Sequence, residues 1–538
     1  MPIRNSVPVL FNPNGLSDSS DQGSSFPGSC QIISNLIFDR NNRGQVIGRP
    51  GAKQVTDFTG VTTPTVVSVM FSVGTLIYGM IATQRNPGFD EPFCYDTVAN
   101  AFITVSGVTG ANVPATQSTS GDWTPPTMAA VGVFIVVTHP GFSGANFFGN
   151  FDVSNPAAPV WSAGNTATNP LPSVPIWVSS FFGRAYFGIK NNVYFTDSLA
   201  LSISNANFAA VLTIGDQSFT TGAAGLPMSQ TSGSVLQSLL VFKGSSVWQI
   251  SGDISLTNNP LSLNRLVDNV GCISPRTIQS TPLGVIFIAN DGPRYVNLSG
   301  TVNYLQLRQG VTPDIVQAFS TVTNPSRMIG CYINGIYRVC FDGSINIWDS
   351  SYTSQDYWYD FIFGRWNGPH TFDYHCAVGV NNTFYLASNI VTHKLFSSEV
   401  TPVSTVVYQD AGENYVCELV STAIEGQPMT MSAIIESTIE LDGTGVGTTY
   451  YISVYDQNNN NLSPATIRLY EINPLWGSVK WGQFKWRSSV IGDGVFTIPW
   501  VNPVVFKKIV LSVRVDGGPN VGIKNTFGRV QALGYTNG

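Results

Sequence analysis

The clearest structural pattern in the chain begins at Val133-Phe134-Ile135-Val136-Val137 and ends at Trp161. The apolar run stops at His139-Pro140-Gly141, and a second aromatic run reaches Phe151-Asp152. Short runs of Val, Ile, Phe and Tyr that Gly, Pro, Asn and Asp interrupt are typical of β-strands joined by tight turns. This stretch therefore predicts a small antiparallel sheet, and almost the whole chain follows the same all-β pattern.

An aromatic-Asp pair followed by another aromatic residue recurs along the chain. The examples are Tyr95-Asp96 before Phe102, Phe151-Asp152 before Trp161, and Trp348-Asp349 and Tyr359-Asp360 before Trp366. The strands repeat at roughly 40 to 50 residues, which is the spacing of propeller blades. In a blade, the Asp would bond the backbone of its own turn and the second aromatic would pack back between blades. Unrelated hairpins of a sandwich give no reason for this spacing, so we favour a β-propeller.

Seven segments fit blades, and six or seven blades are expected to close the ring. They are residues 61–110, 126–165, 173–215, 232–266, 270–308, 325–368 and 372–400. We expect an N-terminal extended β arm at 1–60, the propeller at 61–402, and a C-terminal antiparallel β-sandwich at 403–538. The sandwich is predicted from the strands at 448–454 and 506–515, and it can pack with the arm as a platform. One helix is expected from Thr312, as N-cap, to Phe319.

The composition describes an unusually neutral surface. Only 11% of the 538 residues are charged, against roughly 25% in an ordinary soluble protein, so we expect much surface to be buried against neighbouring subunits. The net charge of −6 gives no overall basic field to attract nucleic acid. Residues 471–538 hold eight Lys and Arg against three acids. That basic end could guide docking to an acidic partner. Alternatively, its lysines could merely keep an exposed edge strand from pairing with another chain.

The seven cysteines show no paired spacing, and we expect them to be small, reduced core residues of strands. They are Cys30, Cys94, Cys272, Cys331, Cys340, Cys376 and Cys417. The N-terminus lacks the apolar segment of a signal peptide, and no apolar stretch is long enough for a membrane-spanning segment.

Few residues suggest metal chemistry. The histidines are His139, His370, His375 and His393, and two of them lie near Asp373 and Cys376. In a strand, His375 and Cys376 would point to opposite faces, and a second pair of ligands at standard spacing is missing. We therefore expect no metal site and no cofactor.

Two acidic segments, Asp356 to Asp360 and Asp410 to Asn414, could in principle hydrolyse glycosides as paired carboxylates. Acids in turns are common in β proteins, and none of the usual catalytic motifs is present. The sequence therefore predicts no catalytic residue and a protein that is not an enzyme.

Ordered pieces of the sequence resemble the tail hub or nozzle proteins of short-tailed bacteriophages, a family that includes tail tubular protein B. The pieces are Asn35-Leu36-Ile37-Phe38-Asp39-Arg40, Gly48-Arg49-Pro50-Gly51, residues 183–187, 192–197, 240–253, 271–276 and 284–292. They cover about a quarter of the chain, and each is common by itself, so their order carries the resemblance. Pro293 and residues 204–208 depart from the family's pattern.

The resemblance implies a structural virion protein, assembled in the host cytoplasm. It would form a ring, usually a hexamer, below the portal and the tail adaptor. That ring would line the exit channel for double-stranded DNA without reading its sequence, and would carry tail fibres or spikes. The alternatives are a receptor-binding or saccharide-cleaving phage tail protein, for which Tyr352 and Tyr357 to Tyr359 could stack on sugars, and a propeller lectin.

Overall fold

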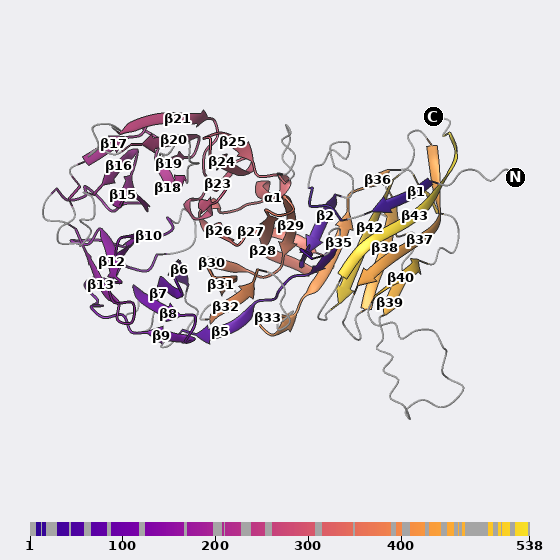
Figure 1. Cartoon of the computed structure of the whole chain (residues 1–538), viewed down its shortest axis with the longest axis horizontal. Helices are drawn as coiled ribbons and strands as arrows, with labels where there is room; N and C mark the ends of the chain where they lie inside the picture. The colour runs from indigo at the N-terminus through magenta and orange to yellow at the C-terminus, as the bar shows by residue number, and fades with distance from the viewer. Residues whose placement is uncertain are drawn as a thin grey trace, which may run out of the picture. The chain divides into compact units, whose positions relative to one another are not determined.

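The computed structural model describes the chain with gaps. The described residues are 7–11, 13–17, 29–41, 45–58, 66–82, 88–117, 124–165, 169–196, 207–208, 210–226, 238–252, 261–306, 315–347, 350–388, 394–400, 409–425, 430–442, 449–456, 461, 465–468, 493–498, 504–506, 508–516 and 522–535. Contacts divide the chain into two units (Figure 1). The propeller unit holds residues 54–344 and 372–400, and the terminal unit holds residues 1–53, 345–371 and 401–538.

Blades 1 to 5 of the propeller unit are four-stranded antiparallel sheets with their strands in chain order. Blade 1 is β6 (Val67–Val73), β7 (Leu76–Ala82), β8 (Asp90–Asp96) and β9 (Ala101–Ile103); blade 2 is β10 (Thr127–Val131), β11 (Phe134–Thr138), β12 (Phe148–Asp152) and β13 (Val160–Gly164). Blade 3 is β14 (Trp177–Phe181), β15 (Arg184–Ile189), β16 (Asn192–Phe195) and β17 (Ala210–Thr213); blade 4 is β18 (Thr220–Leu226), β19 (Ser238–Lys243), β20 (Ser246–Ser251) and β21 (Ser262–Asp268). Blade 5 is β22 (Gln279–Thr281), β23 (Gly284–Ala289), β24 (Gly292–Asn297) and β25 (Val302–Tyr304).

The ring closes after seven blades. Blade 6 begins with the pair β26 (Ile329–Ile333) and β27 (Ile336–Ile347), and blade 7 contains β30 (Tyr374–Val380), β31 (Thr383–Ser388) and β32 (Lys394–Glu399). Each first strand contacts the first strands of the blades before and after it, and β30 contacts β6. Figure 1 shows this circular arrangement. The predicted β-propeller is confirmed, with seven as the number of blades.

The fourth strand of blade 7 comes from the N-terminal part of the chain. Strand β5 (Lys53–Asp57) pairs with β32, and Lys394 Nζ donates a hydrogen bond of 2.8 Å to Gln54 Oε1. The sequence placed these residues in the arm at 1–60, because an exposed strand of mixed polarity gives no apolar run to detect. Blade 4 likewise begins before the predicted residue 232, at β18, whose sequence of Thr, Gly and Ala contains only one large apolar residue, Leu226.

Two of the aromatic-Asp hairpins fold in blades as predicted, whereas the Tyr359-Asp360 hairpin belongs to the terminal unit and Trp348-Asp349 lies outside the described residues. Asp96 Oδ1 accepts a 2.8 Å hydrogen bond from the Val98 amide, and Asp152 Oδ1 accepts one of 3.0 Å from the Ser154 amide. The rings of Phe151 and Trp161 then meet edge to face, with 5.0 Å between their centroids. Trp161 belongs to a hydrophobic core that includes Tyr78 of the preceding blade. The aspartate thus fixes the turn, and the following aromatic packs between two blades.

The terminal unit contains two antiparallel sheets, which agrees with the predicted C-terminal sandwich. One has the order β3 (Leu36–Phe38), β4 (Val46–Gly48), β43 (Gly522–Tyr535), β37 (Thr430–Asp442) and β40 (Asp493–Ile498), with β1 (Val7–Phe11) on β43 and β41 (Val504–Phe506) on β37. The other has the order β28 (Ser350–Asp360), β29 (Arg365–His370), β2 (Cys30–Ser34), β35 (Val416–Ser421), β42 (Lys508–Asp516), β38 (Thr449–Asp456) and β39 (Ala465–Arg468), with β36 (Ile424–Glu425) on β42. A short hairpin joins β33 (Gln409–Asp410) to β34 (Glu413–Asn414).

Helix is scarce in the described part of the chain. The predicted helix is present only as α1 (Gln317–Ser320), and the expected cap, Thr312, lies outside the described residues. Two 3-10 turns occur at Pro275–Thr277 and Pro325–Arg327. No helix among the described residues is long and apolar enough to cross a bilayer.

The cysteines lie in the core as predicted, and all but Cys272 lie in strands. All seven are free and buried. Burial is the main cause that raises the pKa of the Cys331 thiol to about 12 and that of the Cys376 thiol to about 11. The thiolate is the reactive form of cysteine, so these side chains act as small hydrophobic groups.

Candidate functional site: the central cavity of the propeller

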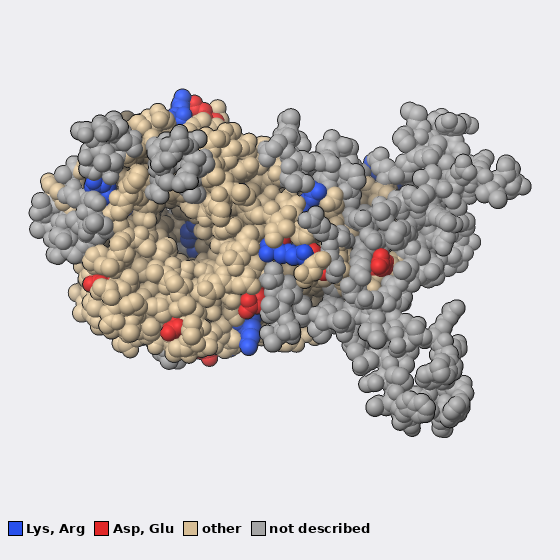
Figure 2. Space-filling view, in the orientation of Figure 1, with Lys and Arg blue, Asp and Glu red and all other residues tan. Residues whose placement is uncertain are grey.

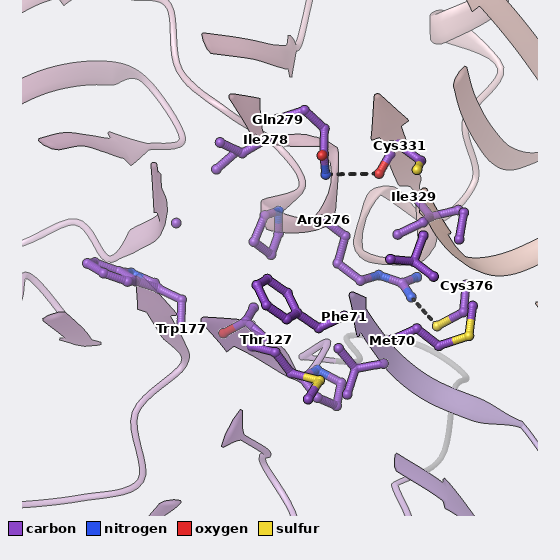
Figure 3. A pocket seen from close by; sticks show the side chains of 18 of the residues that line it. Met70, Phe71, Thr127, Trp177, Arg276, Ile278, Gln279, Ile329, Cys331 and Cys376 are labelled. Carbon is purple, nitrogen blue, oxygen red and sulfur yellow. Dashed lines mark hydrogen bonds between the residues drawn. The ribbon is translucent and has the colours of Figure 1, made fainter. Parts of the chain in front are cut away.

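A cavity of about 320 Å³ lies where the first strands of all seven blades converge (Figure 3). Figure 2 shows the corresponding hollow in the propeller surface, with few charged atoms around it. The cavity is lined by residues 69–72, 126–128, 177–178, 222–223, 275–276, 278–279, 329–332 and 376–379. Enclosed sites that bind small molecules commonly begin at about 300 Å³, so the cavity is large enough for a small ligand.

Hydrogen bonds from neutral side chains join the blades around this cavity. Thr127 Oγ1 accepts a bond of 2.8 Å from the Val178 amide, and Trp177 Nε1 donates one of 3.0 Å to Thr220 Oγ1. Further joints are Ser280 Oγ to Gly225 O at 2.8 Å, Gln279 Nε2 to Gly330 O at 3.0 Å, and Ser72 Oγ to Gly379 O at 2.9 Å. Three of these five bonds therefore join a neutral side chain of one blade to the backbone of a neighbouring blade.

Arg276 is the charged residue among the described residues that line the cavity. Its Nη1 donates a hydrogen bond of 2.7 Å to the carbonyl of His375, and its Nη2 donates one of 2.8 Å to the carbonyl of Arg327. These bonds join the segments that precede the first strands of blades 5 and 6 to β30 of blade 7. Burial lowers the pKa of the Arg276 guanidinium from its ordinary value.

A second polar cluster lies in the terminal unit and joins segments far apart in the sequence. The guanidinium of Arg49 donates to both carboxylate oxygens of Asp410, and its Nε donates a 2.9 Å bond to Asn35 Oδ1. The Asn35 side-chain amide donates to the carbonyl of Val416 at 2.7 Å. Burial opposes the charge on Arg49, but the adjacent Asp410 carboxylate outweighs this and raises the pKa of Arg49. Asp410, an acid that the sequence singled out for glycoside hydrolysis, is therefore the ion-pair partner of Arg49.

The other acidic segment also forms internal bonds in the terminal unit. Asp356 Oδ2 accepts a hydrogen bond of 2.7 Å from Trp358 Nε1, and Asp360 accepts one of 2.8 Å from the amide of Ile362. Arg40 Nε also donates to Asp360, at 3.2 Å. Neither acid lines the central cavity.

The described histidines have separate surroundings. His370 Nδ1 accepts the backbone N–H of Asn35 at 3.0 Å, and His139 Nδ1 accepts that of Gly141 at 3.0 Å. In both rings the proton of the neutral form is therefore on Nε2, which faces Asn367 Oδ1 and Asp90 Oδ2 respectively.

His375 and Cys376 belong to the propeller unit, and Cys376 Sγ donates to the carbonyl of Val67. The described residues contain no group of three or more His, Cys, Asp or Glu that could hold a metal ion, and His393 lies outside them.

Fold and cavity together define a β-propeller protein with a second, β-sandwich unit. The sequence matches no protein-family model and no curated protein. Solved structures that are similar include the AfRom2 CNH domain, with 8% identity, a TM-score of 0.28, and coverage of 70% of this chain and 96% of that domain. An engineered family 43 glycoside hydrolase shows 12% identity and a TM-score of 0.24, with 89% and 99% coverage. A mutant sialidase of Trypanosoma rangeli shows 9% identity and a TM-score of 0.24, with 99% and 97% coverage.

The sequence predicted that the chain is not an enzyme, and that exclusion is wrong. Two of these three structures are described as a glycoside hydrolase and a sialidase. Enzymes therefore occur among the structures to which the chain is similar. At such low identity the likeness concerns the fold alone, and fold does not determine function.

Proposed function

We propose that the chain is a hub subunit of a short bacteriophage tail, a ring-forming scaffold that surrounds the DNA exit channel. The observation that carries the proposal is the location of the resembling sequence pieces. Asn35 and Arg49, from the two N-terminal pieces, form the buried network with Asp410. The pieces at 183–187 and 192–197 fall on the two central strands of blade 3, that at 240–253 on those of blade 4, and that at 284–292 on β23 of blade 5. The resembling pieces thus lie in the N-terminal segment and in blades 3 to 5.

A rigid and weakly charged framework suits such a role. Apart from Arg276, the blade joints described around the cavity use neutral side chains and backbone carbonyls, and only 11% of all residues are charged. Neutral polar surfaces can be buried in permanent interfaces at a lower desolvation cost than charged ones. DNA binding is driven largely by Lys and Arg, so a weakly charged wall would let a duplex slide past.

The DNA path in this proposal lies between copies of the chain. The central cavity of one propeller has a volume of only about 320 Å³, which a cylinder about 12 Å wide, the width of the B-DNA major groove alone, would fill over a length of only about 3 Å. A duplex therefore cannot pass along the axis of a single propeller. A channel of sufficient width needs several copies around a common axis, with the adaptor at one end and fibres or spikes attached outside.

Light scattering after size-exclusion chromatography tests the proposal. The purified chain, alone or with the adaptor of its parent particle, should elute as a closed assembly of several copies. Double-stranded DNA should not increase its mass at physiological salt. A chain that remains monomeric in the presence of the adaptor would contradict the hub role.

Saccharide cleavage by a tail protein stays a second proposal, because a β-propeller is compatible with either function. Glycoside hydrolysis needs two carboxyl groups that flank the scissile bond at about 5 to 10 Å from each other. The described lining of the central cavity contains neither Asp nor Glu, so a catalytic pair would have to lie elsewhere. Release of soluble sugars from host surface glycans by the purified chain would favour this function.

A further inference from the structure

A second pocket of the propeller unit lies where the first strands of blades 2 to 5 approach their turns, and we call it the turn pocket. Its volume is about 480 Å³, and it is lined by residues 130–132, 180–183, 225–226, 238 and 280. The central cavity is lined by earlier residues of the same blades, at 126–128, 177–178, 222–223 and 275–279. The turn pocket is thus the next hollow along these strands, and it is large enough for a small ligand.

The described lining of the turn pocket contains no ionisable side chain. Ser280 is exposed, and its Oγ donates to the carbonyl of Gly225 at 2.8 Å, so the hydroxyl oxygen can still accept a hydrogen bond. Beside such hydroxyl groups lie the apolar residues Phe181, Phe182 and Leu226. A charged ligand would lose water here without an opposite charge in the described lining. The wall therefore favours a neutral ligand with both apolar and hydrogen-bonding surface.

Phe182 occupies a turn position at which phenylalanine is unfavourable. With Gly183 it forms the two-residue turn between β14 and β15, at φ values of 46° and 66°. Two positive values are typical of a type I′ turn, whose first position favours Asn or Gly because a bulky side chain is strained there. The equivalent turn of blade 6 has the favoured pair Asn334-Gly335, at 45° and 80°. Blade 3 thus holds an aromatic residue where Asn would fit more easily.

The strained backbone holds the ring of Phe182 at the wall of the turn pocket. The ring packs edge to face on Phe181, with 4.4 Å between the centroids, but it is only partly buried. Strained positions persist where the surrounding structure fixes them, and they are concentrated at functional sites. The ring of Phe182 is therefore the best candidate for a contact with a ligand in this pocket.

We propose that the turn pocket binds a neutral sugar ring, a β-glucopyranoside, with a C–H face against Phe182 and hydroxyl groups toward the serines. All substituents of this ring are equatorial, so both faces are apolar and the hydroxyl groups lie at the rim. That distribution matches an aromatic ring bordered by neutral hydroxyl groups. Hydrolysis needs a pair of carboxyl groups, and the described lining has none, so the site binds without cleaving. It needs only one copy of the chain and is independent of the hub role.

Methyl β-D-glucopyranoside is the probe, and methyl β-D-glucuronide is its charged counterpart with the same ring. Saturation-transfer difference NMR of the full chain with millimolar probe should show transfer to the ring C–H protons of the glucoside. The glucuronide should respond much less, because the described lining offers no cation for its carboxylate. No transfer to the glucoside, or an equal response to both sugars, would overturn the proposal.

A substitution at Gly225 tests whether the sugar occupies the turn pocket. A Cβ atom added at Gly225 meets no atom within 4 Å, so a side chain there enters open space. Gly225→Leu should fill the pocket and abolish the transfer, whereas the smaller Gly225→Ala should keep it. Transfer that persists in Gly225→Leu would place the sugar elsewhere and refute the site.

A substitution at Phe182 separates binding from stability. Phe182→Asn restores the residue that the turn favours, so the melting midpoint of the chain should stay the same or rise. The transfer to the glucoside should nevertheless be lost, because the aromatic face is gone. Transfer that persists in Phe182→Asn would show that the ring serves only to pack on Phe181, and would overturn the proposal.

Discussion

Buried cations in this protein are bonded largely to backbone carbonyls. Arg276 reaches two carbonyls in the propeller unit, Arg184 Nη1 donates to that of Thr196 at 2.9 Å, and Lys243 Nζ donates to that of Asp216 at 2.8 Å. A long cationic side chain can thus join loops and strands by hydrogen bonds to their backbone, without a partner side chain. Arg276, Arg184 and Lys243 thus each have an identifiable structural role.

The ion pair between Arg49 and Asp410 gives a prediction about stability. Asp410→Ala leaves the fully buried guanidinium without its carboxylate and should destabilise the terminal unit by about 3–5 kcal/mol. The double variant Arg49→Met/Asp410→Leu should lose less, because no uncompensated charge remains. Urea unfolding followed by tryptophan fluorescence measures both. The neighbouring exposed Glu413 is the control, since Glu413→Ala should change stability by no more than about 0.5 kcal/mol.

The ion pair of Lys243 and Asp216 gives a prediction about stability at low pH. The hydrogen bond from buried Lys243 lowers the pKa of the Asp216 carboxyl to about 2, with Ser218 contributing further bonds. Because this pKa is lower in the folded protein than the ordinary value of about 3.8, the stabilisation is present above that ordinary value. It is lost as the pH falls toward 2. Asp216→Asn should therefore unfold with a weaker pH dependence between about pH 4 and pH 2, as circular dichroism can measure. An unchanged acid transition would show that this pair does not contribute.

At the scale of elements, the sequence predicted turns that depend on neighbouring residues. It missed the pairing of segments that are far apart in the chain. The Asp96 and Asp152 turns lie within a few residues of the aromatics they position, so their spacing alone revealed them. Strand β5 pairs with β32 more than 300 residues later, and nothing local in its five residues indicates that partner. The same holds for the contacts of Asn35 with residues 370, 371 and 416. Asn35 and Arg49 lie within the resembling pieces, but those pieces do not show what the two side chains bind.

The closing strand of blade 7 can be tested by proline substitution. Neighbouring residues of an edge strand point their N–H groups in opposite directions, so of Val55→Pro and Thr56→Pro one removes a hydrogen bond to β32 and the other does not. Hydrogen exchange should show faster exchange across β31 and β32 in one of these variants only. Equal protection of β32 in both would mean that β5 does not hold the ring closed.

Replacing the aromatic residue that follows an Asp turn should destabilise the protein more than replacing its neighbour in the sequence. Trp161 is about 1% exposed and packs between blades 1 and 2, so Trp161→Ala should cost about 3–5 kcal/mol. The adjacent Val160 is 45% exposed, and Val160→Ala should change stability by no more than about 0.5 kcal/mol. Thermal unfolding of the two variants makes the comparison. A similar loss in both would contradict the role assigned to the hairpin aromatic.

At the scale of the whole molecule, the fold class was predictable from the sequence. The way in which the chain is divided between the two units was not. Strand length and turn residues indicated a propeller and a sandwich. The terminal unit is nevertheless built from residues 1–53, 345–371 and 401–538, and composition marks no boundary near residue 345. The central cavity also escaped prediction, because its lining comes from seven strands that are separated by tens of residues and carry no shared motif.

Electron microscopy of the purified full-length chain with the adaptor of its parent particle tests the hub proposal most directly. We expect closed rings in which several propellers surround a common channel wide enough for a DNA duplex. Single propellers, or trimeric spikes without an axial channel, would contradict the proposal and favour a receptor-binding or saccharide-cleaving role.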